Sequence, residues 1–175
     1  MKNIIAVLVF VLLAVGQVFA QNNLATVDTE YILSNIPAYE SSQNQLDEMS
    51  KKWEKEVQDK RAMVKKLYED FQNNYVLLSE EMRKKKEAEI VAAETAVRDL
   101  QKKYFGPEGE LFKKREELVK PIQDNVYAAI KEIAEEGSFD LIFDTASSGV
   151  SILYANPEID LSDNVLEKLG YGSNK

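Results

Sequence analysis

The fold can be predicted from residues 46–118, which read LDEMSKKWEKEVQDKRAMVKKLYEDFQNNYVLLSEEMRKKKEAEIVAAETAVRDLQKKYFGPEGELFKKREEL. In its first half, apolar residues recur about every 3.6 positions, which is the helical period. They are Leu46, Met49, Trp53, Val57, Val64, Leu67, Phe71, Tyr75 and Leu78, and only Lys60 interrupts the series. The second half repeats every seven residues, at Ile90, Val97, Tyr104, Leu111 and Leu118. A repeat of seven is typical of a coiled-coil seam, so residues 38–136 are predicted to form two long helices folded into an antiparallel hairpin.

The turn of this hairpin is predicted between Leu78 and Ser79. Ser79 is followed by Glu80 and Glu81, and a hydroxyl cap followed by acids is favourable at the positive end of a helix. Facing residue numbers then add to 157, so that Trp53 faces Tyr104. The seven-residue repeat alone would also allow sums of 150 or 164, and the capping residues select 157. Each helix of the hairpin is about 60 Å long, too thin to enclose a core, so it must project from a body.

Two breaks are predicted in the returning helix. Gly106-Pro107-Glu108-Gly109 combines a proline, which removes a helical hydrogen bond, with two flexible glycines. We expect a hinge there. Pro121 is a second and weaker interruption, close to where the arm should enter the body.

The body is predicted from the two ends of the mature chain, residues 21–37 and 137–175. Residues 24–28 suit a strand, and Asp28 or Thr29 can cap a short helix that Pro37 ends. Apolar and polar residues alternate over 139–144 and over 150–155, which predicts a β-hairpin. Ser162 is expected to cap a closing helix that ends at Gly170. The predicted fold class is therefore mainly α, with a long helical hairpin projecting from a small β body.

So small a body is marginally stable by itself, so we expect it to oligomerise. Its strands carry apolar residues on both faces, more than one short helix can cover. The predicted oligomer interface consists of Leu141, Ile142, Phe143, Ile152 and Leu153.

The N-terminus predicts export. Lys2 precedes twelve apolar or small residues, and Val18-Phe19-Ala20 offers small or compact residues at the positions that a signal peptidase reads. Twelve residues are too few to span a bilayer, which needs about 20. Residues 1–20 are therefore interpreted as a cleavable secretory signal peptide.

The composition excludes several function classes. Cysteine and histidine are both absent, so there is no thiol chemistry and the commonest general base and metal ligand are missing. The net charge is −8, unlike a protein that neutralises nucleic-acid phosphates with basic residues. Asp140 and Asp144 share a predicted strand face, which we interpret as two solvated acids. We expect no enzyme activity, no cofactor and no nucleic-acid partner.

The candidate binding residues lie beside the seam of the predicted hairpin, and some of them lie at its tip. Exposed apolar groups on a projecting arm indicate binding, although closing the turn would also place apolar residues there. Basic residues beside the tip suit an acidic lipid headgroup or a segment of a client protein, although a solvated helix face is the simpler interpretation. The candidates are Met63, Tyr68, Val76 and Leu77, with the basic clusters Lys65, Lys66 and Arg83, Lys84, Lys85, Lys86.

The mature chain resembles the Skp/OmpH family of periplasmic chaperones. The most specific residues are Phe139-Asp140-Leu141-Ile142-Phe143-Asp144, and Asp160-Leu161-Ser162 leading into Val165-Leu166-Glu167-Lys168-Leu169-Gly170; Val27 to Leu33 also fits. The resemblance implies a homotrimer whose strands join into a central β body and whose three arms enclose a cavity. Unfolded outer-membrane β-barrel proteins would be held in that cavity.

We therefore expect an ATP-independent holdase of the periplasm, with a membrane-surface contact through the arm tips as a further expectation. The alternative is a coiled-coil spacer or tether of the cell envelope that has no chaperone role. Such a tether would need a membrane anchor or a second interaction module, and the sequence shows neither beyond the hairpin.

Overall fold

The computed structural model describes residues 23–147, 149 and 151–172. The predicted signal peptide, residues 1–20, lies outside these residues. The chain forms, in order, β1 (Leu24–Val27), α2 (Thr29–Ser34), α3 (Pro37–Asn74), the short 3-10 helix η1 (Tyr75–Leu77), α4 (Glu80–Phe105), α5 (Glu110–Leu118), α6 (Lys120–Glu136), β2 (Leu141–Asp144), the 3-10 helix η2 (Pro157–Ile159) and α7 (Ser162–Lys168).

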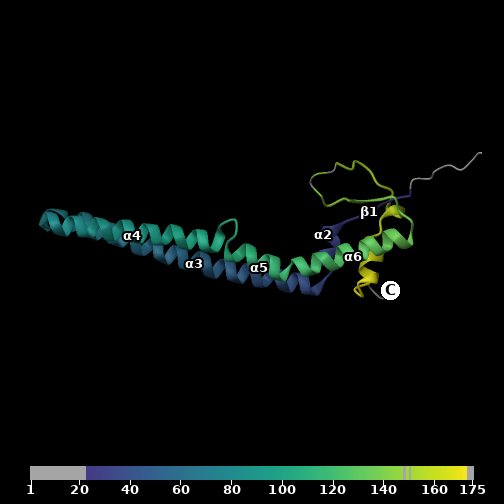
Figure 1. Cartoon of the computed structure of the whole chain (residues 1–175), viewed down its shortest axis with the longest axis horizontal. Helices are drawn as coiled ribbons and strands as arrows, with labels where there is room; N and C mark the ends of the chain where they lie inside the picture. Colours follow the sequence, from purple (N-terminus) through teal and green to yellow (C-terminus); the bar gives the residue numbers. More distant parts are fainter. Residues whose placement is uncertain (1–22, 148, 150, 173–175) are drawn as a thin grey trace, which may run out of the picture.

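The long helical hairpin is confirmed. Figure 1 shows α3 running out from the body and α4 returning beside it, with α5 and α6 continuing back toward the body. Pro37 is the first residue of α3. A backbone N–H at that position would have no partner within the helix, so proline costs no hydrogen bond there. The 38 residues of α3 correspond to about 57 Å at 1.5 Å per residue, close to the expected length.

The predicted register is confirmed in the outer part of the arm. The rings of Trp53 and Tyr104 are stacked, with centroids 4.9 Å apart and planes 7° apart. A register displaced by seven residues would instead place Trp53 opposite Val97 or Leu111. Around the stack lies a buried cluster that we call the arm core: it consists of Val57, Val97 and Tyr104, with Trp53, Val64, Leu100 and Phe105 partly buried against it.

The predicted turn is also confirmed. The α3 helix ends at Asn74, η1 follows, and Ser79 is the N-cap of α4. The Ser79 hydroxyl oxygen accepts a hydrogen bond from the Met82 amide at 3.3 Å. This bond satisfies one of the amides that a helix start leaves without a partner.

Both predicted breaks in the returning helix are present. Helix α4 ends at Phe105, α5 begins at Glu110, and residues 106–109 form a loop that stands out from the arm (Figure 1). Gly109 needs to be glycine because a Cβ there would lie 2.8 Å from the Tyr104 carbonyl oxygen. The second break separates Leu118 from Lys120, and Pro121 lies in the first turn of α6.

The body has a small core to which α6 contributes. We call it the body core, and it consists of Val27, Ile32, Ile36, Val126, Ala129, Val165 and Leu166. Val126 and Ala129 belong to α6, so the base of the returning helix is packed into the body. Lys168 on α7 forms ion pairs with two residues of the same helix, Glu136 at 2.8 Å and Glu132 at 3.1 Å.

The predicted β-hairpin is wrong. Among the described residues, the sheet has two strands, and β2 pairs in parallel with β1, from Leu24 with Leu141 to Val27 with Asp144. Residues 151–156 form no strand in the described structure, and Val150 lies outside it. Alternation of apolar and polar residues indicates a strand only where one face is covered. In this segment Leu153 is 97% exposed, so the described residues offer no apolar surface that covers it.

The predicted cap at Ser162 is also wrong, whereas the one at Asp28 is confirmed. Asp28 Oδ1 accepts a hydrogen bond from the Tyr31 amide at 2.8 Å. Leu161 precedes α7 as its N-cap, and no side chain makes the cap bond. The Ser162 hydroxyl instead donates to Asp160 at 2.6 Å and accepts from the Asp28 amide at 2.8 Å. Ser162 therefore joins the start of α7 to the start of α2.

We predict that Trp53→Ala will lower the free energy of unfolding by about 2 kcal/mol, because it removes both buried area and an aromatic stack. Urea unfolding at matched protein concentration measures the change. Lys52→Ala, next to it on the exposed side of α3, is the control and should alter stability by less than about 0.5 kcal/mol. Equal effects of the two substitutions would contradict a register set by the stack.

We also predict a specific loss of arm stability at alkaline pH. The Tyr104 hydroxyl donates to Glu56 at 2.8 Å, and this bond raises the pKa of Tyr104 above its usual 10.0. The folded arm holds the phenol proton more tightly than the unfolded chain does. This contribution is therefore complete below pH 10 and disappears as the pH rises through the raised pKa. Tyr104→Phe should reduce the alkaline loss in thermal unfolding curves, and Tyr127→Phe, at an exposed site on α6, should not.

Candidate functional site

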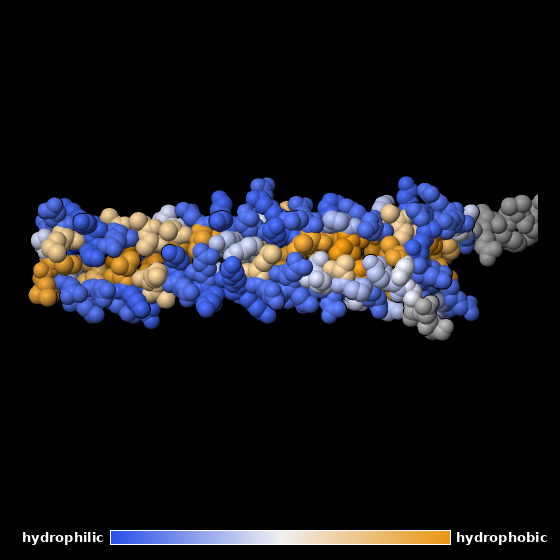
Figure 2. All heavy atoms as spheres, turned by 90° about the horizontal axis from the view of Figure 1, so that it is seen from below, coloured by the Kyte–Doolittle hydropathy of each residue, from blue (hydrophilic) through white to orange (hydrophobic). Residues whose placement is uncertain are grey.

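The tip of the arm exposes two neighbouring apolar side chains. Val76 is 86% exposed and Leu77 is 82% exposed, and both lie in η1, the single tight turn that joins α3 to α4. The turn joins α3 to α4, and no third element among the described residues covers these side chains. Figure 2 shows apolar atoms at this end of the arm. We call the residues Tyr75, Val76 and Leu77 the apolar tip.

Arg83 is part of the turn. Its Nε atom donates to the Tyr75 carbonyl oxygen at 3.0 Å, and its guanidinium carbon lies 4.2 Å from the centroid of the Tyr75 ring. The first contact satisfies a carbonyl at the end of α3, and the second is a cation–π contact. Arg83 therefore holds the apolar tip in place, so its charge is not a free binding group.

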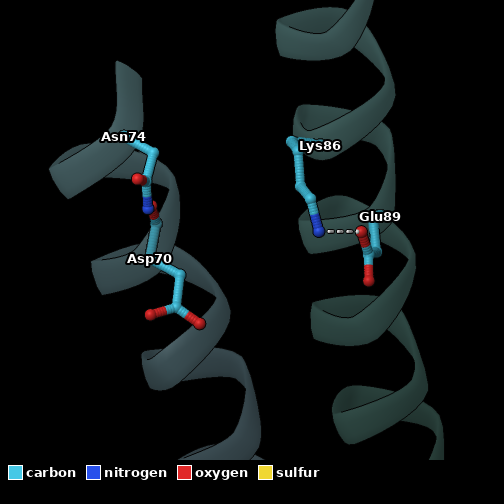
Figure 3. Close-up of polar contacts among 4 residues, drawn as sticks. All are labelled: Asp70, Asn74, Lys86 and Glu89. Carbon is cyan, nitrogen blue, oxygen red and sulfur yellow. Dashed lines mark hydrogen bonds and ion pairs between the residues drawn. The ribbon is translucent and has the colours of Figure 1, made fainter. Parts of the chain in front are cut away.

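The three lysines that follow are exposed on α4 and make only local ion pairs. Lys84 pairs with Glu80 at 3.1 Å and Lys86 with Glu89 at 2.9 Å. Figure 3 shows the second pair along α4, with Asp70 and Asn74 on the neighbouring α3. Lys85 has no ion pair within the part of the chain that the structure describes. Exposed pairs of this kind are worth about 0–1 kcal/mol each, so these lysines can exchange partners readily.

The remaining candidates are exposed but lie apart from one another. Met63 and Tyr68 are both on the outer part of α3. Their separation of five residues turns them by roughly 140° around the helix, so they do not share a face. Lys65 pairs with Glu69 at 3.7 Å, and Lys66 is exposed. The predicted site residues therefore form one group at the tip and scattered positions along α3.

Sequence reasoning missed three exposed apolar residues of the outer arm. Tyr75, Met82 and Val91 are all exposed. Tyr75 was assigned to the seam, and Val91 directly follows the buried Ile90. The seam is only one residue wide on each helix, so a hydrophobic residue next to a seam position is a signal of exposure. Met82 and Val91 extend the exposed apolar area from the apolar tip along α4.

A cavity of about 240 Å³ lies halfway along the arm, beside the arm core. The residues that line it are Glu54, Val57, Gln58, Arg61, Gln101 and Phe105. Arg61 Nη2 donates to the Gln101 side-chain oxygen at 2.6 Å and bridges the two helices across it. Two of the lining residues, Val57 and Phe105, are apolar and the other four are polar, and Phe105 directly precedes the loop at residues 106–109.

The two acids of the β2 segment have structural roles. Asp144 accepts hydrogen bonds from the Thr29 amide and hydroxyl and from the Ala146 amide, at 2.8–3.2 Å. Asp140 accepts from the Asn23 amide at 3.0 Å. These bonds fasten the two ends of the body together. Over residues 23–147, 149 and 151–172, no group of three or more Asp or Glu side chains is placed to hold a metal ion. The described helices include none that is long and apolar enough to cross a membrane.

The five residues predicted for the oligomer interface differ in exposure. Leu153 is 97% exposed and Leu141 is 57% exposed. Ile142, Phe143 and Ile152 are half-buried, and Ile142 packs against the body core. Leu141 and Leu153 are therefore free to contact another molecule, whereas Ile142 already contributes to the subunit.

Comparison with known proteins identifies a family and a crystal structure to which this chain is similar. No sequence among the curated proteins matches the chain. The fold is similar to a crystal structure of a candidate outer membrane chaperone (OmpH-like) from Caulobacter crescentus CB15, with a TM-score of 0.64, 11% sequence identity, and coverage of 89% of this chain and 87% of that chain. Residues 23–169, nearly all of the described chain, match the OmpH family model, described as outer membrane protein (OmpH-like). The chain belongs to the OmpH-like family.

Proposed function

We propose that the protein is a periplasmic, ATP-independent holdase that binds unfolded outer-membrane proteins and keeps them soluble before membrane insertion. The observation that carries the proposal is the exposure of Val76 and Leu77 at the end of a long arm. A spacer or tether gains nothing from apolar groups that it cannot bury. The similar Caulobacter protein is described as an outer membrane chaperone of the OmpH-like type, and this supports the same role here.

The arrangement favours many weak contacts over one strong site. Apolar side chains and exchangeable lysines are spread along the outer arm, and Met63 and Tyr68 add positions on two sides of α3. A client segment that touches several of them is held at high effective concentration, so avidity supplies the affinity. Such contacts impose no fixed conformation on the client, which suits its later release.

Assembly would multiply this effect, and we propose that the protein acts as a homotrimer. Support comes from Leu141 and Leu153, which are exposed on the body away from the arm core. Their burial between subunits would contribute roughly 1.5–3 kcal/mol for each side chain. Several arms on one assembly would surround a client that a single arm only touches.

A contact between the arm tip and a membrane surface is a second proposal about the same residues. Val76 and Leu77 lie in η1, and Lys84, Lys85 and Lys86 are exposed in the second turn of α4, the helix that follows it. Apolar side chains beside basic ones suit the interface of an acidic lipid bilayer. This contact would position the chaperone for the delivery of its client.

We predict that Val76→Ser combined with Leu77→Ser will weaken the binding of an unfolded outer-membrane β-barrel protein by about tenfold. That change corresponds to about 1.4 kcal/mol, less than the burial of two such side chains provides. Fluorescence titration at low and at physiological salt measures it. Tyr127→Ser on α6 is the control, because Tyr127 is 71% exposed but lies near the body.

Changing Lys84, Lys85 and Lys86 to glutamine should weaken client binding only a few-fold, because exposed ion pairs are weak. Arg83 is retained, since it holds the turn. Loss of nearly all binding in this variant, or at physiological salt, would show that charge holds the client. No binding by the native protein under any condition would favour the tether. The same variants, titrated with acidic and with neutral phospholipid vesicles, separate the membrane proposal from the client proposal.

For the oligomer we predict that Leu153→Asp will yield folded monomers. The charge would be buried at the subunit interface but lies in solvent in the free subunit. Ile142→Asp should instead destabilise the subunit itself, because Ile142 packs against the body core. Sedimentation velocity and circular dichroism distinguish the two results. A native protein that sediments as a stable monomer would contradict the trimer.

A further inference from the structure

The middle of the arm is the only positively charged part of it. We call residues 51–61 of α3, together with residues 96–106 opposite them, the basic belt. The basic belt contains eight basic and four acidic residues, a net charge of +4. Residues 62–95, nearer the tip, have a net charge of −1, and residues 38–50 with 107–119, nearer the body, have a net charge of −4. An acidic partner would therefore be attracted to the middle of the arm.

The cations of the basic belt also differ from their neighbours in how they are partnered. Nearer the tip, Lys65 and Lys84 pair with glutamates, and nearer the body Lys113 and Lys114 do the same. None of the eight basic side chains of the belt forms an ion pair with any residue that the structure describes. Cations that no local acid neutralises create a positive potential that steers acidic groups toward them.

The cavity of about 240 Å³ beside the arm core lies within this belt, to which all of its lining residues belong. Its volume is several times the roughly 30 Å³ that one water occupies in the liquid, so it has room for one large side chain. Val57 is buried and Phe105 is half-buried, and both offer apolar contact. An aromatic side chain gains most from such a site, because it buries a large area and can pack against the Phe105 ring.

Arg61, which lines the cavity, is a cation with a neutral partner. Its Nη2 atom donates to the Gln101 side-chain oxygen at 2.6 Å, its one side-chain hydrogen bond within the described chain. A guanidinium group has five donors, so further donors remain for a carboxylate, which arginine binds through two parallel bonds. Arg98 lies three residues before Gln101 on α4 and so shares its helix face. The acid of the cavity, Glu54, lies seven residues from Arg61, about 10 Å along α3.

We propose that the basic belt is a binding site for acidic polypeptide segments that contain an aromatic residue. The aromatic side chain enters the cavity, where it contacts Val57 and Phe105. A neighbouring carboxylate of the segment binds Arg61 and Arg98. The inference rests on the proposed function, because an unfolded client would supply such segments, and it adds selectivity for sequence to the contacts of the apolar tip. An exposed ion pair contributes little by itself, so the aromatic and the acidic contact must act together.

Short fluorescent peptides measure this selectivity, in anisotropy titrations with the purified protein at physiological salt. The first peptide carries aspartate, phenylalanine and aspartate in a glycine–serine background. In the second peptide alanine replaces phenylalanine, and in the third lysine replaces both aspartates. We expect the first to bind about tenfold more tightly than the second, because only the first fills the cavity, and the third to bind least. Equal binding of the first two would show attraction by charge without use of the cavity and would overturn the proposal.

Substitutions in the cavity show where the peptide binds. Arg61→Gln should weaken binding of the first peptide about tenfold, because it removes the charged donor. Gln58→Trp fills the cavity from an exposed position and should weaken the first peptide while leaving the second unchanged. The matched control is Arg115→Gln, which removes the same charge from an exposed position on α5 and should change binding less than about twofold. Equal effects of Arg61→Gln and Arg115→Gln, or no effect of Gln58→Trp, would overturn the proposal.

Two further titrations separate this inference from the proposed function and from a lipid site. Arg61→Gln should weaken the binding of an unfolded outer-membrane β-barrel protein only a few-fold, because the other contacts of the arm remain. Binding of the barrel protein without any preference among the peptides would overturn this inference alone. A peptide preference without binding of the barrel protein would overturn the proposed function alone, and binding of neither would overturn both. Phosphatidylglycerol vesicles that displace the peptide from the native protein, and that bind Arg61→Gln weakly, would identify a lipid site and overturn the peptide site.

Discussion

The stack of Trp53 on Tyr104 is the contact on which the outer arm depends. Two helices alone bury little surface, so a few large side chains must determine how they align. The two rings lie 4.9 Å apart at the centre of the arm core, and the Tyr104 hydroxyl is fastened to Glu56 at 2.8 Å. A displacement by one turn would separate the rings and break this bond. This alignment of α3 with α4 determines which residues form the hairpin turn, and it therefore leaves the apolar tip exposed.

The arm is only two helices wide, and this explains why many of its apolar side chains are exposed. A pair of helices has an inside only one residue wide, and hydrophobic residues next to that line remain in contact with solvent. Tyr68, Val91 and the apolar tip are exposed for this reason. In a larger domain a third element would cover them. Here a long arm of only two helices keeps apolar side chains exposed, and a chaperone is the kind of protein that uses exposed apolar side chains.

The body contains few residues, and with them it must hold both ends of the arm. It does so by joining segments that are far apart in the chain. Strands β1 and β2 pair in parallel from Leu24 with Leu141 onward, Asp144 binds Thr29 at 2.8 Å, and Lys168 joins α7 to α6 at 2.8 Å. These contacts close the body around the base of α6. They leave Leu141 and Leu153 exposed on the outside of the body.

From the amino-acid sequence alone one can predict the hairpin, its turn at Ser79, its outer register and the break at Gly106 to Gly109. Helical periodicity, capping and helix breaking act over a few residues, so they can be read locally. Three-dimensional packing determines the parallel pairing of β1 with β2, the role of Ser162 as a link to Asp28, and the contact of Arg83 with Tyr75. It also determines that residues 151–156 form no strand in the described subunit. Each of these depends on which distant surface is available for contact, and local patterns of apolar residues carry no information about that.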